Sequence, residues 1–155
     1  MALAGGPAAA RNRAPMLLTR RDDLPRATAV ELVRLQSSRI VVLGASGAVS
    51  DDVAAQLAQH ASRVDRIGGA GRYDTAALVP AATFSAGLDV VYLATGEDFP
   101  DALAGVPAAA AAGAPVLLVE NGRMPDVVAA QIQRLNPSRI FVGVCGRRAG
   151  PEGSG

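Results

Sequence analysis

Residues 89–119 read DVVYLATGEDFPDALAGVPAAAAAGAPVLLV, and this stretch decides the fold class. It opens on an apolar run at Asp89–Ala94, continues into a helical pattern at Pro100–Ala112 and closes on a second apolar run at Pro115–Val119. Short apolar runs rich in β-branched residues predict buried strands, whereas a first-turn proline and a glycine just past the end predict a helix. This succession of strand, helix and strand is typical of a parallel sheet.

The same alternation continues toward the C-terminus. Pro125–Leu135 places apolar residues at helical spacing, and Arg139–Val142 is a third short apolar run. We therefore expect Val90–Ala94, Val116–Val119 and Ile140–Val142 to share one mostly parallel sheet. Continuous apolar strands need cover on both faces, so the predicted architecture is a three-layer α/β fold with helices on both sides of the sheet.

The chain also matches itself. Ala2-Leu3-Ala4-Gly5 recurs as Ala102-Leu103-Ala104-Gly105, one hundred positions later, and the match runs without a gap as far as Ile40 and Ile140. Because it includes Pro, Arg and Ser as well as the common Ala, we interpret it as a tandem repeat of a structural unit of about 100 residues. The backbones of Ala2–Val42 and Ala102–Val142 should therefore superpose.

The first copy should show the same order of elements as the second. The predicted elements are helices at 2–10, 25–35 and 51–60 and strands at 15–19 and 39–43. A new unit begins near Val64. We therefore divide the chain into the C-terminal part of a first unit at 1–63, a nearly complete second unit at 64–146, and a tail at 147–155 that we expect to be disordered because it has little to bury.

The composition argues against several classes of function. A formal net charge of +1 and a pI near 8.0 give too weak a field for a dedicated nucleic-acid binder. The single Cys145 excludes an internal disulfide framework, and the single His60 cannot supply the ligands of a catalytic zinc site. We predict a chain that is not an enzyme and has no metal site and no cofactor.

The N-terminal segment does not resemble a targeting signal. Met1–Ala10 is small and apolar, but no basic leader precedes it and Arg11 and Arg13 follow it. We expect no signal peptide, and a chain expressed as it stands should stay in the cytoplasm. The Ala-rich segments are interrupted by Gly and Pro, so we also predict no membrane span.

The first motif with possible chemistry runs from Leu93 to Gly105, where a strand passes through a loop into a helix. Asp98, Pro100 and Asp101 fit the cap and first turn of that helix. The alternative is a ligand site, because α/β folds bind ligands at the carboxyl ends of parallel strands. Capping is favoured for the two aspartates, and the two interpretations are balanced for Thr95 and Glu97.

The second motif, at 66–77, is a glycine-rich turn between a predicted strand and a helix. It lacks the Gly-Lys-Ser/Thr of a phosphate-binding P-loop and the spacing of a dinucleotide fingerprint, so we do not expect a nucleotide site. Arg72 could tether two elements or bind a polyanion at the helix N-terminus, and Asp74 or Thr75 could close the turn.

Both motifs resemble the cell-wall-binding repeat type 2 family. Its usual phrases are Gly-Ala-Asp-Arg-Tyr-x-Thr-Ala, which 69–76 matches except at Gly71, and Ala-Thr-Gly-x-x-Phe-Pro-Asp-Ala-Leu-Ala-Gly, which 94–105 matches throughout. The chain would hold about one and a half repeats. The resemblance implies a secreted bacterial surface protein whose repeats, usually three, associate and anchor an effector domain to the wall, as in surface layers. It makes the following residues the candidate ligand contacts: Arg72, Tyr73, Thr75, Thr95, Glu97 and Asp98.

The function that the resemblance implies is non-catalytic anchoring to an anionic wall polymer or to peptidoglycan. Other copies of the repeat are the second expected partner, within one chain or by self-association. Two alternatives stay open: a truncated remnant without binding activity, and the binding region of a peptidoglycan amidase whose catalytic domain lies elsewhere. The polymer's identity does not follow from the sequence.

Overall fold

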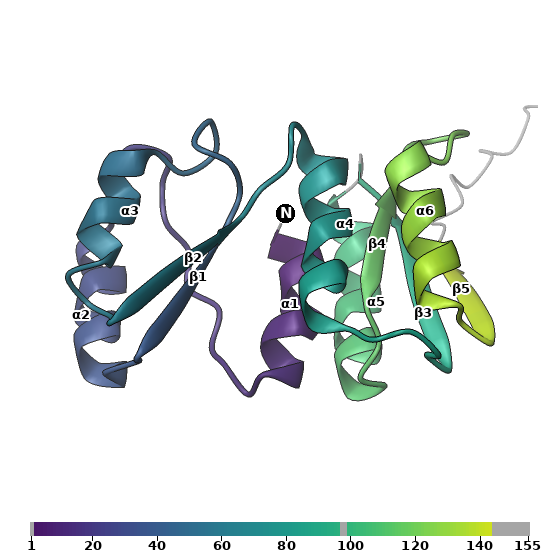
Figure 1. The fold of residues 1–155 in the computed structure, drawn as a ribbon, viewed down its shortest axis with the longest axis horizontal. Coiled ribbons are helices and arrows are strands. Elements are labelled where there is room, and N and C mark those ends of the chain that lie inside the picture. Colours follow the sequence, from purple (N-terminus) through teal and green to yellow (C-terminus); the bar gives the residue numbers. More distant parts are fainter. Residues whose placement is uncertain (1, 97–98, 144–155) are drawn as a thin grey trace, which may run out of the picture.

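The computed structural model describes residues 2–96 and 99–143, with residues 2 and 99–104 described by their backbone alone. Helices and strands alternate along the chain (Figure 1). In order they are α1 (Ala2–Arg11), α2 (Arg26–Leu35), β1 (Arg39–Leu43), α3 (Asp51–Leu57), β2 (Arg63–Ile67), α4 (Arg72–Thr83), β3 (Val90–Thr95), α5 (Phe99–Ala111), β4 (Val116–Val119), α6 (Asp126–Leu135) and β5 (Arg139–Gly143). The tail expected at 147–155 lies outside the described residues.

The larger sheet confirms the predicted three-layer arrangement. Its strand order is β4-β3-β5 and both pairings are parallel. Val91 and Leu93 face α4 and α6, while Tyr92 and Ala94 face α1 and α5, because successive side chains of a strand point to opposite faces. Apolar side chains on both faces explain why these strands are continuous apolar runs rather than alternating ones.

The smaller sheet pairs β1 with β2, again in parallel. Helices α2 and α3 cover one face, where Val42, Val53 and Leu57 form a separate core with Leu32. Leu43 and Ile67, on the opposite face, pack against the core of the larger sheet. The two sheets therefore belong to one continuous packed structure.

Helix α1 joins the two sheets. Its Leu3 and Ala4 share a core with Ala109 of α5. A Cβ atom on Gly5 would overlap the Leu43 side chain, and one on Gly6 would lie 2.7 Å from Val106 of α5. Two successive glycines thus allow α1 to pass closely between β1 and α5, since larger side chains would hold the elements apart. None of the described helices has the length and apolar character needed to cross a membrane.

The strand expected at 15–19 is wrong, because residues 14–20 form no regular structure. Among the described strands, its counterpart β4 is hydrogen-bonded only to β3. A strand needs a neighbour to satisfy its backbone, and nothing described here supplies one for 15–19. The order of the helices and of β1 and β5 is the same in the two copies, this segment differs, and the superposition of their backbones stays a prediction.

The remaining boundaries differ from the expected ones by small amounts. The helix expected at 51–60 ends at Leu57, and the one expected at 25–35 begins at Arg26, after Pro25 at the N-cap. Ser50 caps α3 by accepting a hydrogen bond from the Val53 backbone, as expected for serine at this position.

Candidate functional site

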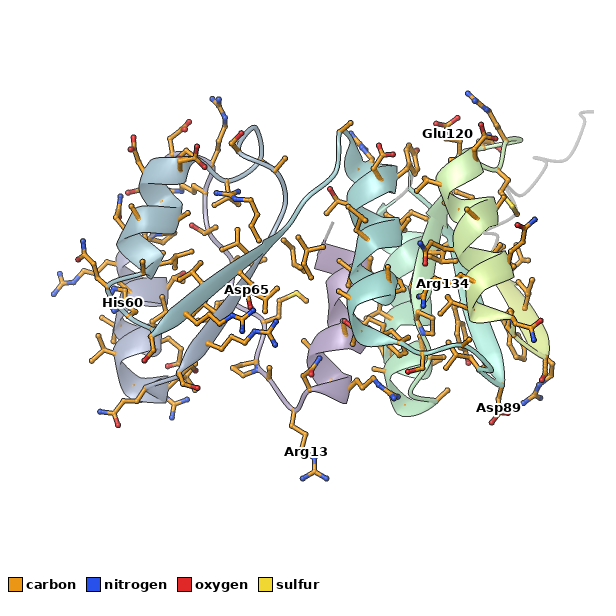
Figure 2. All side chains as sticks on the ribbon, in the orientation of Figure 1. Arg13, His60, Asp65, Asp89, Glu120 and Arg134 are labelled. Carbon is orange, nitrogen blue, oxygen red and sulfur yellow. The ribbon has the colours of Figure 1, made fainter. Side chains whose placement is uncertain are left out.

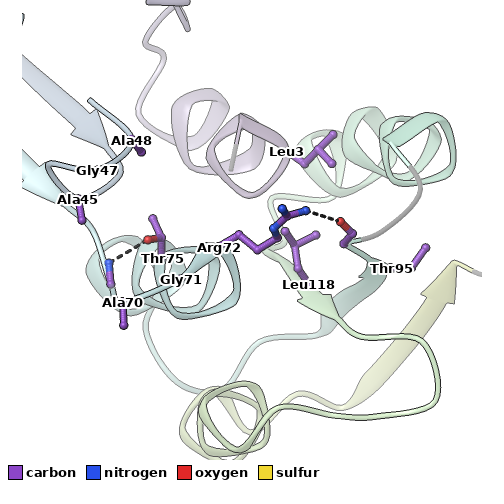
Figure 3. A pocket seen from close by; sticks show the side chains of 12 residues that line it. Leu3, Ala45, Gly47, Ala48, Ala70, Gly71, Arg72, Thr75, Thr95 and Leu118 are labelled. Carbon is purple, nitrogen blue, oxygen red and sulfur yellow. Dashed lines mark hydrogen bonds between the residues drawn. The ribbon is translucent and has the colours of Figure 1, made fainter. Parts of the chain in front are cut away.

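A cavity of about 480 Å³ opens where the carboxyl ends of β1, β2 and β3 meet the start of α4 (Figure 3). Because parallel strands end on one side of a sheet, their following loops gather there. The cavity is lined by small and apolar residues, two threonines and one arginine. These are Leu3, Ala45, Gly47, Ala48, Gly69, Ala70, Gly71, Arg72, Thr75, Thr95, Gly96 and Leu118.

The turn before α4 is closed by two side chains of that helix. The Asp74 carboxylate accepts a hydrogen bond from the Gly71 backbone N–H at 3.0 Å, and the Thr75 hydroxyl accepts one from Gly69 at 2.8 Å. Thr75 is only 1% exposed, so its hydroxyl is a structural acceptor inside the turn. Both residues therefore close the turn, as the sequence suggested.

Arg72 reaches across the cavity. One guanidinium nitrogen donates a long hydrogen bond of 3.4 Å to the Gly96 carbonyl oxygen, which lies just past β3 (Figure 3). This contact supports the tether interpretation of Arg72. A bond of this length leaves the exposed guanidinium largely available, and Arg72 is the one charged residue among the described residues that line the cavity.

Close backbone approaches shape the cavity walls. A Cβ atom on Gly68 would overlap the backbone at Gly44 and Ala45, so the loops after β1 and β2 lie directly against each other. A Cβ atom on Gly96 would come within 2.7 Å of the Tyr73 ring. Glycine is needed at both positions because the space for a side chain is already filled.

The structure brings together Arg72, Thr75 and Thr95 of the residues suggested by the sequence. Tyr73 does not line the cavity; its ring packs on Gly96 and on the core beside α1. Glu97 and Asp98 lie outside the described residues. The side chains of Pro100 and Asp101, expected in the first turn of α5, are not described either, so the proposed caps stay predictions.

Sequence reasoning missed the small residues of the cavity, above all Ala45, Gly47 and Ala48. The rule that ligands bind at strand carboxyl ends applies to β1 as much as to β3, and it could have pointed to this loop. What the rule could not show is that the loop after β1 faces the start of α4.

The acidic groups with shifted pKa values lie away from the cavity. Hydrogen bonds from Arg63 and then Arg39 lower the pKa of Asp65, which sits between them on the smaller sheet (Figure 2). His60 lies beyond α3, at the far end of the molecule from α4. Across 2–96 and 105–143 no three His, Cys, Asp or Glu side chains gather as metal ligands would.

Comparison with known proteins identifies relatives of this chain. The profile of a family described as Cell wall binding domain 2 matches residues 2–54 and 66–148. Two Bacillus subtilis (strain 168) proteins are similar over 120 residues at 34% identity: an amidase enhancer and the N-acetylmuramoyl-L-alanine amidase LytC. The matched region is 77% of this chain, but only 17% of the first protein and 24% of the second.

Solved structures share the fold. Cwp6 from Clostridium difficile superposes with a TM-score of 0.85 over 96% of this chain, at 20% sequence identity. Cwp8 from the same organism gives a TM-score of 0.73 over 90% of the chain, at 22% identity. The matched regions are 24% and 28% of those chains, so this chain corresponds to a part of each.

Proposed function

Because this chain belongs to the cell wall binding domain 2 family, we propose that it anchors a bacterial surface protein non-covalently to an anionic wall polymer. At the coarser level, the family makes the chain a cell-wall-binding module. The finer proposal concerns the kind of contact and the ligand's charge.

The observation that supports the proposal is the guanidinium of Arg72 at the open cavity. Arginine presents a planar fork suited to carboxylate and phosphate oxygens, and its charge does not titrate in proteins. Arg72 is also the first residue of α4, where the helix dipole favours a negative ligand. Contact through Arg72, with Thr95 on the opposite wall, would hold one anionic group of a polymer.

Anchoring of this kind involves no turnover. Each module would bind weakly, since a single exposed cation contributes little at physiological salt. Several modules, linked in one chain or self-associated, would bind more strongly through avidity. We expect the module to work at the cell wall, outside the cell, as family membership suggests.

The similarity to LytC favours one related possibility. The match covers 24% of that amidase, which supports this chain as the binding region of a peptidoglycan hydrolase. In that arrangement the module would position a catalytic domain on its substrate, and the chemistry would take place in the other domain. The role of the module itself is the same in both cases.

A pull-down on purified cell walls tests the proposal. We expect wild-type protein to be retained at low salt and released as salt rises, and Arg72→Ala to be retained less. Arg26→Ala is the matched control, because Arg26 opens α2 as Arg72 opens α4 and does not line the cavity. Equal retention of both variants would remove Arg72 from the site. A folded wild-type chain that is never retained would favour the remnant interpretation.

A further inference from the structure

We propose that the cavity is a junction site, formed only where two consecutive units meet, and that it takes one sugar-sized group carrying one negative charge. This rests on the proposed wall-binding function and specifies the ligand of the same site. The inference follows from the origin of the walls, the size of the cavity and the number of charges in it.

The walls come from both units. Leu3 of α1 and the loop residues Ala45, Gly47 and Ala48 belong to the first unit, whereas the start of α4, the end of β3 and Leu118 belong to the second. The contact between Gly68 and the Gly44–Ala45 backbone holds the two loops in place. Either unit alone would contribute one side of an open surface.

The size and lining suggest the ligand's chemistry. A volume of about 480 Å³ lies within the range of pockets that hold small molecules, and it is too small for a long stretch of polymer. Within the part of the lining that the structure describes, Arg72 is the one cation, and the other groups are apolar, hydroxyl or backbone. One negative charge can be matched here, while several adjacent charges would remain unpaired and repel one another.

Backbone donors add to the arginine. The N–H groups of Ala45, Gly47 and Ala70 donate no hydrogen bond to any described residue, and each belongs to a residue of the lining. Hydroxyl groups of a sugar are suitable acceptors for such donors. The cavity therefore combines one strong anion contact with neutral hydrogen bonds, which fits a sugar phosphodiester or a sugar carboxylate better than inorganic phosphate.

A ligand that touches both units should stabilise the folded chain, because it binds the native state and not the unfolded one. We would titrate the full chain with two sugars that carry one negative charge, the methyl phosphodiester of N-acetylglucosamine 1-phosphate and glucuronic acid, and compare uncharged N-acetylglucosamine and inorganic phosphate. The two charged sugars should raise the melting temperature and shift the amide signals of both Ala48 and Ala70. The uncharged sugar and inorganic phosphate should bind about tenfold more weakly or worse.

Two substitutions test the composite wall. Ala48→Trp fills the cavity from the first unit and Ala70→Trp from the second, and each alanine is exposed enough to accept a larger side chain. Each should weaken binding of the charged sugar at least about tenfold, as should Arg72→Ala. Ala27→Trp, on the exposed side of α2, is the control that should leave binding unchanged.

The outcomes separate this inference from the proposed function. Retention on walls with no binding of either charged sugar, or with unchanged binding by both tryptophan variants, would overturn the junction site and leave wall binding standing. Amide signal shifts confined to one unit of the wild-type protein would also overturn the junction site. This measurement needs no variant, so it holds even if the variants fail to fold. Loss of wall retention by the wild-type protein would instead reject the proposed function itself.

Discussion

Segments 15–19 and 115–119 occupy equivalent positions in the two copies and have different structures. Both begin at an Ala-Pro pair and contain a Leu-Leu pair, yet the second is the buried strand β4 and the first is irregular. Leu118 is 2% exposed, whereas its counterpart Leu18 is 72% exposed. The difference shows that an apolar run becomes a strand here only where a neighbouring strand receives its backbone.

The two ends of the duplication differ in a second way. Val42 of β1 is 5% exposed, while its counterpart Val142 of β5 is 60% exposed. Strand β1 has β2 beside it and α3 over it, and no described element takes the corresponding places beside β5. Among the described residues, the two copies therefore have neighbours on opposite sides, β2 beside the first and β3 beside the second.

The largest contrast should appear on truncating the two equivalent leucines. Leu118→Ala should lower the free energy of unfolding by about 2–5 kcal/mol, because it leaves a cavity in a packed core. Leu18→Ala should change it by no more than about 0.5 kcal/mol, since that side chain is already in water. Urea denaturation of both variants measures the difference. Equal losses would mean that Leu18 is buried in solution.

Arg134 and Arg34 provide the next comparison. Arg134 donates to the carbonyl oxygens of Phe84 at 3.1 Å and Pro80 at 3.2 Å, so it closes the end of α4. Arg34 forms an exposed ion pair with Glu31 instead. Arg134→Ala should cost about 1–3 kcal/mol, and Arg34→Ala should cost less because its ion pair is screened by solvent.

Thermal or urea unfolding of the two arginine variants checks this ordering. Arg134→Lys serves as a control that keeps the charge and loses the fork needed to reach two carbonyls at once. A full rescue by lysine would show that charge near the helix end matters and that the paired hydrogen bonds do not.

Two equivalent glycines should respond in opposite directions to alanine. No described atom lies within 4 Å of the place that a Cβ on Gly105 of α5 would take, so Gly105→Ala should stabilise the protein by about 0.5–1 kcal/mol through helix propensity. Gly5 of α1 faces the Leu43 side chain, so an added methyl group would overpack this contact. The cost of overpacking should exceed the gain in helix propensity, and Gly5→Ala should destabilise the protein by about 1 kcal/mol. Denaturation curves give both signs, and two stabilising substitutions would show that α1 does not press on β1.

The smallest effect concerns pH and the smaller sheet. Asp65 has a lowered pKa because Arg63 and Arg39 donate hydrogen bonds to it, so its contribution is present above its ordinary pKa of 3.8 and disappears as pH falls through the folded value. Wild type should therefore be slightly more stable than Asp65→Asn at neutral pH, and the gap should close in acid.

The duplication, the α/β class, the parallel pairing and the positions of most elements could be predicted from the sequence. These features depend on local periodicity, on Pro and Gly at element ends, and on the order of elements, all of which can be read along the chain. Arg72, Thr75 and Thr95 could be predicted near one another because each follows a parallel strand or starts the next helix.

Tertiary structure alone decided that two similar segments, 15–19 and 115–119, have different structures. The sequence at 15–19 carries the same strand signal as 115–119, but a strand's free energy lies largely in hydrogen bonds and packing with residues distant in the chain. The cavity could not be predicted from the sequence either, because Ala45, Gly47 and Ala48 have no polar or charged side chain that would indicate a binding site. They become part of a site because the packing of α1 and β1 against the second unit brings their loop to the start of α4.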